Sequence, residues 1–85
     1  MDYHPLQLFG QHLVELRKAQ GWSQERLALE SELARSYVGG IERGQRNLAI
    51  INICILAETL GVTPSEMLNF FPQKKLRYIA SNISK

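Results

Sequence analysis

The chain has 85 residues, of which 45% are hydrophobic and 21% are charged, and its formal net charge is +2. These values are typical of one small globular domain and exclude two domains or a disordered chain. The single cysteine, Cys54, excludes an internal disulfide framework and a multi-cysteine metal site. No apolar run is long enough to span a bilayer and the first residues lack a signal-peptide pattern, so we expect a cytoplasmic location without membrane contact.

Two short helices are expected in the N-terminal third of the chain. Apolar residues recur at helical spacing over residues 6–19, which predicts an amphipathic helix there. Gly21 tolerates the left-handed conformation in which helices commonly end. Ser23 is of the residue type that caps helix N-termini, so we expect a second helix over residues 24–30.

A third helix is expected over residues 35–43, after a short break at residues 31–33. Gly39 and Gly40 lie in its middle, where each glycine costs roughly 1 kcal/mol relative to alanine. Two adjacent helix-weakening residues indicate that this helix closely approaches another surface.

The fourth helix, expected over residues 49–60, carries two apolar stripes. Ile51 and Ile55 form one stripe, for which a monomer of this size has no core. The other stripe is assigned to the core and consists of Ile50, Ile53, Leu56, Ala57 and Leu60.

A fifth helix is expected to begin at residues 63–66, which combine a threonine cap, a proline and a glutamate in capping-box order. Pro72 is expected to end it. The basic segment that follows, residues 72–85, keeps helical spacing and is either a tail or a short sixth helix. We therefore predict an all-α protein, with a compact five-helix, repressor-like domain over residues 1–71.

No arrangement of residues supports catalysis. His4 and His12 are the only histidines, and both are expected to be solvated, with His12 on the exposed side of the first helix. Cys54 has no histidine nearby in sequence and is better interpreted as a small, partly buried side chain. The Gly39-Gly40 pair lacks the pattern of a phosphate-binding loop. We expect no enzymatic activity, no cofactor and no metal site.

The second and third expected helices have the layout of a helix-turn-helix, whose second helix enters the DNA major groove with its N-terminal residues. Arg35 can bond guanine at two points, Ser36 can bond a base edge or a phosphate, and Tyr37 can bond a phosphate or contact a thymine methyl. Gly39 lies on the same face, where a missing side chain would let the backbone approach the bases. The alternative is a solvated face with ordinary surface arginines. The loop that follows carries two arginines suited to phosphates, Arg43 and Arg46.

Three stretches carry a more specific pattern: Ser-Gln-x-x-Leu-Ala from Ser23, Ile-Glu-Arg-Gly from Ile41 and Leu-Gly-Val-Thr-Pro from Leu60. Over residues 6–70 the chain resembles the phage-repressor-like helix-turn-helix family, also called the XRE family. Residues 35–48 are similar to one subgroup, the controller proteins of restriction–modification systems, which are small homodimeric regulators. The resemblance implies a sequence-specific, double-stranded DNA-binding transcriptional regulator.

The resemblance also implies roles for individual residues. Gln24 is expected to contact a phosphate and to brace the recognition helix, while Glu42 is expected to be structural and to pair with Arg17. The residues expected to read bases are Arg35, Ser36, Tyr37 and Gly39. Those expected to contact the DNA backbone are Ser23, Gln24, Arg43, Gln45, Arg46 and Asn47.

Two positions depart from the family pattern. Many members have glycine in the turn where this chain has Glu32, which must adopt a left-handed conformation or change the turn. Ala34 occupies the N-cap of the recognition helix and forgoes a cap worth about 1 kcal/mol. Neither departure removes a residue expected to read DNA.

The surplus apolar surface predicts a homodimer, although a C-terminal helix folding back over it is the alternative. A two-fold dimer would meet half-sites about one helical turn apart on a near-palindromic operator, where it would block RNA polymerase or contact it. Two other interpretations stay open: an antitoxin-type regulator whose main partner is a toxin, and a protein-interaction domain without DNA binding. The expected interface consists of Ile51, Ile55, Met67, Phe70 and Phe71.

Overall fold

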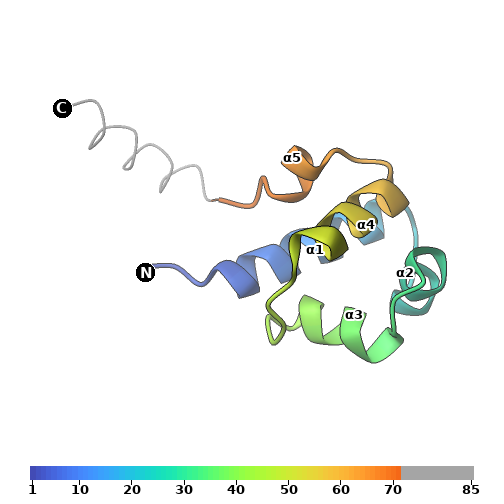
Figure 1. Cartoon of the computed structure of the whole chain (residues 1–85), viewed down its shortest axis with the longest axis horizontal. Coiled ribbons are helices and arrows are strands. Elements are labelled where there is room, and N and C mark those ends of the chain that lie inside the picture. The colour runs from blue at the N-terminus through green and yellow to red at the C-terminus, as the bar shows by residue number, and fades with distance from the viewer. Residues whose placement is uncertain (72–85) are drawn as a thin grey trace.

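The computed structural model describes residues 1–71, and this part of the chain is all-α, as predicted (Figure 1). The prediction of a tail or sixth helix over residues 72–85 lies outside the described residues. The five helices are α1 (Pro5–Ala19), α2 (Gln24–Ser31), α3 (Arg35–Glu42), α4 (Ile50–Leu60) and α5 (Pro64–Met67).

The helices begin and end where local chemistry favours it. The Ser23 hydroxyl accepts the backbone N–H of Arg26 at 3.0 Å, and the Thr63 hydroxyl accepts that of Glu66 at 3.0 Å, so both expected N-caps are confirmed. Helix α5 is shorter than predicted and ends at Met67. The backbone leaves the helical conformation at Leu68, with φ −93° and ψ 2°. The ring of Phe70 then packs edge-to-face on Phe9, with ring centroids 6.0 Å apart.

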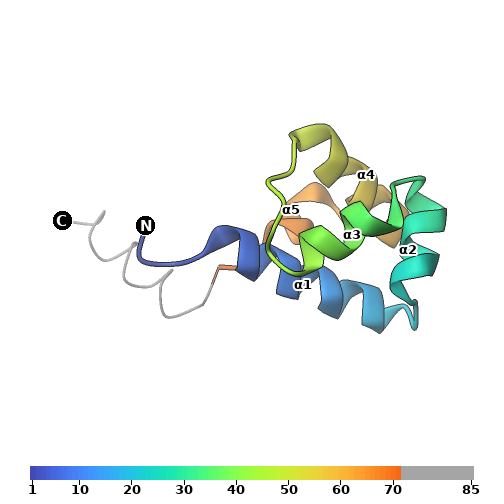
Figure 2. The same ribbon diagram turned by 90° about the horizontal axis from the view of Figure 1, so that it is seen from below.

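All five helices contribute to one core. Helix α1 packs against α3 and α5, α2 packs against α3 and α4, and α4 packs against α5. Both views place α2 and α3 away from the chain's N-terminus (Figures 1 and 2). The fully buried side chains come from every helix and include Leu13, Leu27, Val38, Ile41, Leu56, Leu60 and Met67.

Four predictions about burial are wrong. Cys54 was interpreted as partly buried but is exposed on α4. Ile50 was assigned to the core but is 63% exposed, because it lies in the first turn of α4, beyond the edge of the core. Met67 was expected at a dimer interface but is fully buried, since α5 turns it into the core. His12 is half-buried rather than solvated, and its Nε2 lies 2.7 Å from the carbonyl oxygen of Glu66, which links α1 to α5.

A glycine of α1 allows α3 to approach closely. Helix α3 packs at an angle against α1 (Figure 2), and a Cβ on Gly10 would lie 2.5 Å from the carbonyl oxygen of Ile41 and 2.8 Å from that of Glu42, at the C-terminal end of α3. The close approach of α3 to another surface was expected from its own glycines. In the structure, the glycine that admits α3 belongs to α1.

Candidate nucleic-acid interface

The turn between α2 and α3 keeps its helix-turn-helix form despite the two departures. Glu32 adopts the left-handed conformation, with φ 60° and ψ 25°, and Ala34 provides no side-chain cap. The buried Ser31 hydroxyl supports the turn, since it donates to the carbonyl of Ala28 at 3.3 Å and accepts the backbone N–H of Leu33 at 3.4 Å. Sequence reasoning missed this role, for which a serine at the end of a short helix is the only signal.

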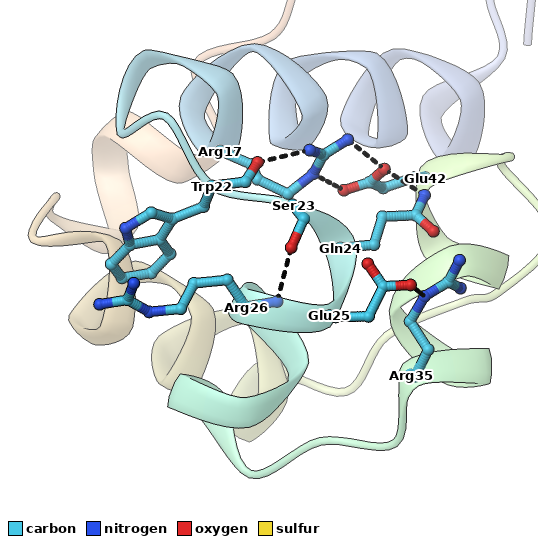
Figure 3. Close-up of polar contacts among 8 residues, drawn as sticks. All are labelled: Arg17, Trp22, Ser23, Gln24, Glu25, Arg26, Arg35 and Glu42. Atoms are coloured by element: carbon cyan, nitrogen blue, oxygen red, sulfur yellow. Dashed lines mark hydrogen bonds and ion pairs between the residues drawn. The ribbon is translucent and has the colours of Figure 1, made fainter.

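A buried ion pair fixes the recognition helix α3 in place (Figure 3). Arg17 of α1 donates through Nε and Nη2 to the two carboxylate oxygens of Glu42, at 2.6 and 3.0 Å. Its Nη1 donates to the carbonyl of Trp22 at 2.7 Å, and Gln24 of α2 donates to Glu42 at 2.6 Å. The hydrogen bond to Glu42 raises the pKa of Arg17. The pair expected from the resemblance is thus present, and Gln24 joins it to α2.

The first turn of α3 presents the residues expected to read bases. Arg35 and Ser36 are exposed, whereas Tyr37 is half-buried. The Tyr37 hydroxyl accepts a hydrogen bond from Asn52 of α4 at 3.0 Å, and the Arg46 guanidinium lies over the Tyr37 ring at 6.0 Å. Tyr37 is therefore oriented by α4 and by the loop after α3, which sequence spacing did not indicate.

The side chains of three arginines lie against the two glycines of α3. We call Arg35, Arg43 and Arg46 the arginine cluster. A Cβ on Gly39 would lie 2.9 Å from Nη1 of Arg35 and 3.0 Å from Nη1 of Arg43. A Cβ on Gly40 would lie 2.9 Å from Cγ of Arg46. Gly39 was expected on an open face, but it is buried beneath these side chains. Its missing side chain makes room for the arginines.

The residues expected to contact the DNA backbone lie in the loop after α3 and at the start of α2. Arg43 donates through Nε to the side-chain oxygen of Gln45 at 3.1 Å, and Arg46 and Asn47 are exposed in the same loop. Ser23 and Gln24 lie at the start of α2, where the Ser23 hydroxyl already serves as the cap. Within residues 1–71, the contacts of Arg43 and Arg46 are with the neutral side chains of Gln45 and Tyr37, which leaves their positive charge for an anionic partner.

Within residues 1–71, no group of three or more His, Cys, Asp or Glu side chains could hold a metal ion. None of the helices described is long and apolar enough to cross a membrane.

A second surface lies on α4. Ile51 is 69% exposed, and Ile50 and Cys54 are exposed beside it, next to the half-buried Ile55. Together with Glu58 these side chains line one shallow surface groove, and we call the four apolar residues the α4 apolar face. Phe70 and Phe71, expected at the same interface, pack on the N-terminal part of the chain instead: the Phe71 ring lies 4.8 Å from that of Tyr3.

Comparison with known proteins places this architecture in a family. The model of a helix-turn-helix family matches residues 13–67. The chain belongs to the XRE-type helix-turn-helix family. Its XRE-type relatives include control protein C.BamHI of Bacillus amyloliquefaciens, which is 44% identical over 64 residues, covering 74% of this chain and 79% of that protein.

Solved XRE-type structures share the fold. The restriction-modification controller protein C.AhdI from Aeromonas hydrophila matches with a TM-score of 0.74 and 57% identity, over 76% of this chain and 98% of that chain. The controller protein C.Esp1396I, solved as a tetramer in complex with its natural 35 base-pair operator, matches with a TM-score of 0.70 and 35% identity, over 78% of this chain and 91% of that chain. The predicted resemblance to controller proteins is confirmed.

Proposed function

We propose that this protein is a sequence-specific, double-stranded DNA-binding transcription regulator that acts as a homodimer on a near-palindromic operator, as a restriction–modification controller. The observation that carries the proposal is the arginine cluster, which a buried ion pair holds in place on a helix-turn-helix frame. The operator complex of C.Esp1396I supports a DNA partner for this chain. Regulation follows from occupancy, because a bound dimer covers promoter DNA or contacts the polymerase there.

The arginine cluster divides into two tasks. Arg35 lies at the N-terminal turn of α3, the part of a recognition helix that meets base edges in the major groove. Arg43 and Arg46 lie beyond the C-terminal end of α3, where side chains meet the sugar-phosphate backbone. The protein therefore reads bases through Arg35, Ser36 and Tyr37. It binds phosphates through Arg43 and Arg46 in the loop after α3.

The dimer partner is a second copy of this chain, joined through the α4 apolar face. A two-fold interface uses the same patch on both copies, so a self-complementary apolar surface suits it. Ile51 is 69% exposed, more than the neighbouring Ile50 at 63%, and lines the same groove as Ile50, Cys54 and Ile55. Met67 has no place in this interface because it is buried.

Two arginine substitutions separate base recognition from phosphate binding. Replacing Arg35 by alanine is expected to cost about 1–3 kcal/mol on the operator and to relax one base position. Replacing Arg46 by alanine should weaken binding to all duplexes alike and lower the salt dependence by about one counterion. Titration of each variant with operator and scrambled duplexes at several salt concentrations checks both; identical behaviour of the two variants would contradict the division of tasks.

Gly39→Ala is expected to change stability and DNA binding in opposite directions. Alanine gains roughly 1 kcal/mol over glycine in a helix interior, and the new methyl would press on the ends of two flexible side chains, with the Gln24 side-chain oxygen in ordinary contact at 3.6 Å. Those ends belong to Arg35 and Arg43, so their displacement should weaken operator binding. Urea unfolding and operator titration test this. A variant that is more stable and binds as well as the parent would show that the arginines do not need the space.

Ile51→Glu is expected to yield a monomer and to lower operator affinity at least about tenfold, because two copies of the protein bind the two half-sites jointly only when they are linked to each other. Sedimentation measures the oligomeric state and titration measures the affinity. Leu29→Glu is the matched control, since Leu29 is 73% exposed on α2 and does not line the groove of the α4 apolar face. Equal oligomeric states for both variants would remove this face from the dimer.

The antitoxin interpretation depended on a partner surface over residues 70–85, nearly all of which lie outside the described residues.

A further inference from the structure

A carboxylate outside the expected DNA-contacting set touches the base-reading arginine. Arg35 of α3 donates through Nε to Oε1 of Glu25 at 3.1 Å (Figure 3), and both side chains are substantially exposed. Glu25 lies in the first turn of α2, next to the residue that braces Glu42. Its own backbone N–H and the Arg35 guanidinium lower the pKa of Glu25, so the carboxylate is charged at neutral pH.

Two features determine where the Arg35 guanidinium lies. Glu25 holds its Nε, and Gly39 leaves the space in which its Nη1 lies. Recognition of guanine needs two guanidinium donors directed at O6 and N7, which an unrestrained arginine must order at an entropic cost. A side chain already held at Nε loses less freedom when its remaining donors meet a base.

We propose that Glu25 is a positioning residue that sharpens base specificity by holding Arg35 for guanine recognition. This inference rests on the proposed DNA-binding function. An exposed ion pair in water contributes little to stability, so folding does not explain the contact. Near DNA, however, the carboxylate repels the phosphates of any duplex, whatever its base sequence. Its hold on Arg35 favours only duplexes that offer the correct base edge. Glu25 therefore weakens binding to all DNA through its charge and favours the operator through Arg35.

The two effects predict different results for two substitutions. Glu25→Ala removes both the charge and the acceptor, so the affinity for a scrambled duplex should rise while the operator-to-scrambled affinity ratio falls roughly 3- to 10-fold, which corresponds to the freedom of one immobilised side chain. Glu25→Gln removes the charge but keeps an acceptor for Nε. It should raise the affinity for both duplexes and keep most of the ratio.

Glu30→Ala is the matched control. Glu30 is an exposed glutamate on the same helix, paired with Arg26 at 3.2 Å, and its removal takes away the same charge without touching Arg35. It should raise the affinity for both duplexes and leave the ratio unchanged. Thermal unfolding of each variant should match that of the parent, because both pairs are exposed.

The decisive experiment measures the dissociation constants of the full chain for an operator selected from random duplexes and for a scrambled duplex of the same composition. The parent, Glu25→Ala, Glu25→Gln and Glu30→Ala are compared, and Glu25→Ala is repeated in an Arg35→Ala background. The proposal predicts that Glu25→Ala lowers the ratio only when Arg35 is present. An unchanged ratio, or an equal fall without Arg35, would overturn it while leaving the proposed function intact. A parent with no sequence preference would overturn both.

Discussion

Replacing Arg17 by alanine is expected to lower the free energy of unfolding by about 3–5 kcal/mol, because it leaves a buried carboxylate without its cation. The side chains of Arg17 and Glu42 are only 10% and 3% exposed, and both oxygens of Glu42 accept from the guanidinium. Within residues 1–71, Gln24 would be the one side chain still donating to Glu42 after the substitution. Since small domains are stable by only about 5–15 kcal/mol, the variant should lose a large share of its stability, and urea denaturation followed by circular dichroism measures the loss.

Arg26→Ala is the matched control for this prediction. Arg26 also pairs with a glutamate, Glu30, but the two side chains are 52% and 42% exposed. A solvent-exposed pair one helical turn apart contributes about 0.3–0.5 kcal/mol, and the contact of the Arg26 guanidinium with the Trp22 ring, 4.9 Å from its centroid, adds about 0.5–1 kcal/mol. Arg26→Ala should therefore cost clearly less than Arg17→Ala. If Arg17→Ala cost no more than Arg26→Ala, the buried pair would not be what fixes the recognition helix in place.

Gly10→Ala is expected to lower the free energy of unfolding by about 3 kcal/mol, at the upper end of the usual range for overpacking. The new Cβ would lie 2.5 Å from the carbonyl oxygen of Ile41, and backbone cannot move aside as a flexible side chain can. Helices α1 and α3 would have to separate, which would also strain the Arg17–Glu42 pair. The same urea titration measures the effect.

The comparison with Gly39→Ala makes this prediction specific. Both glycines lie inside helices, so helix propensity alone would stabilise both alanine variants by roughly 1 kcal/mol. The structure predicts opposite signs, because Gly10 faces backbone and Gly39 faces the ends of arginine side chains. Stabilisation by both substitutions would contradict the close approach of α1 and α3.

Local sequence signals were sufficient to predict most of the helices and the helix-turn-helix. The caps at Ser23 and Thr63 form as expected, because a hydroxyl at a helix start has an unpaired N–H within reach. The helix-turn-helix and its family were predicted from short motifs, and the Arg17–Glu42 pair was expected from that resemblance. The left-handed Glu32 was one of two outcomes that the sequence left open.

Features that depend on tertiary distances were not predictable. Helical periodicity indicates which side of α4 is apolar but not where the core ends, so Ile50 was placed inside it. Met67 could not be assigned to the core without knowing the direction of α5. The contacts of Tyr37 with Asn52 and of Arg35 with Glu25 join separate helices, and no local pattern encodes them.

Selection of binding sites from a random duplex library, performed at two salt concentrations, tests the central claim most directly. The account predicts enrichment of a near-palindromic sequence with half-sites about one helical turn apart, and an affinity that falls steeply as salt rises. Failure to enrich any sequence, with weak binding at both salt concentrations, would contradict the assignment of the arginine cluster to specific DNA recognition.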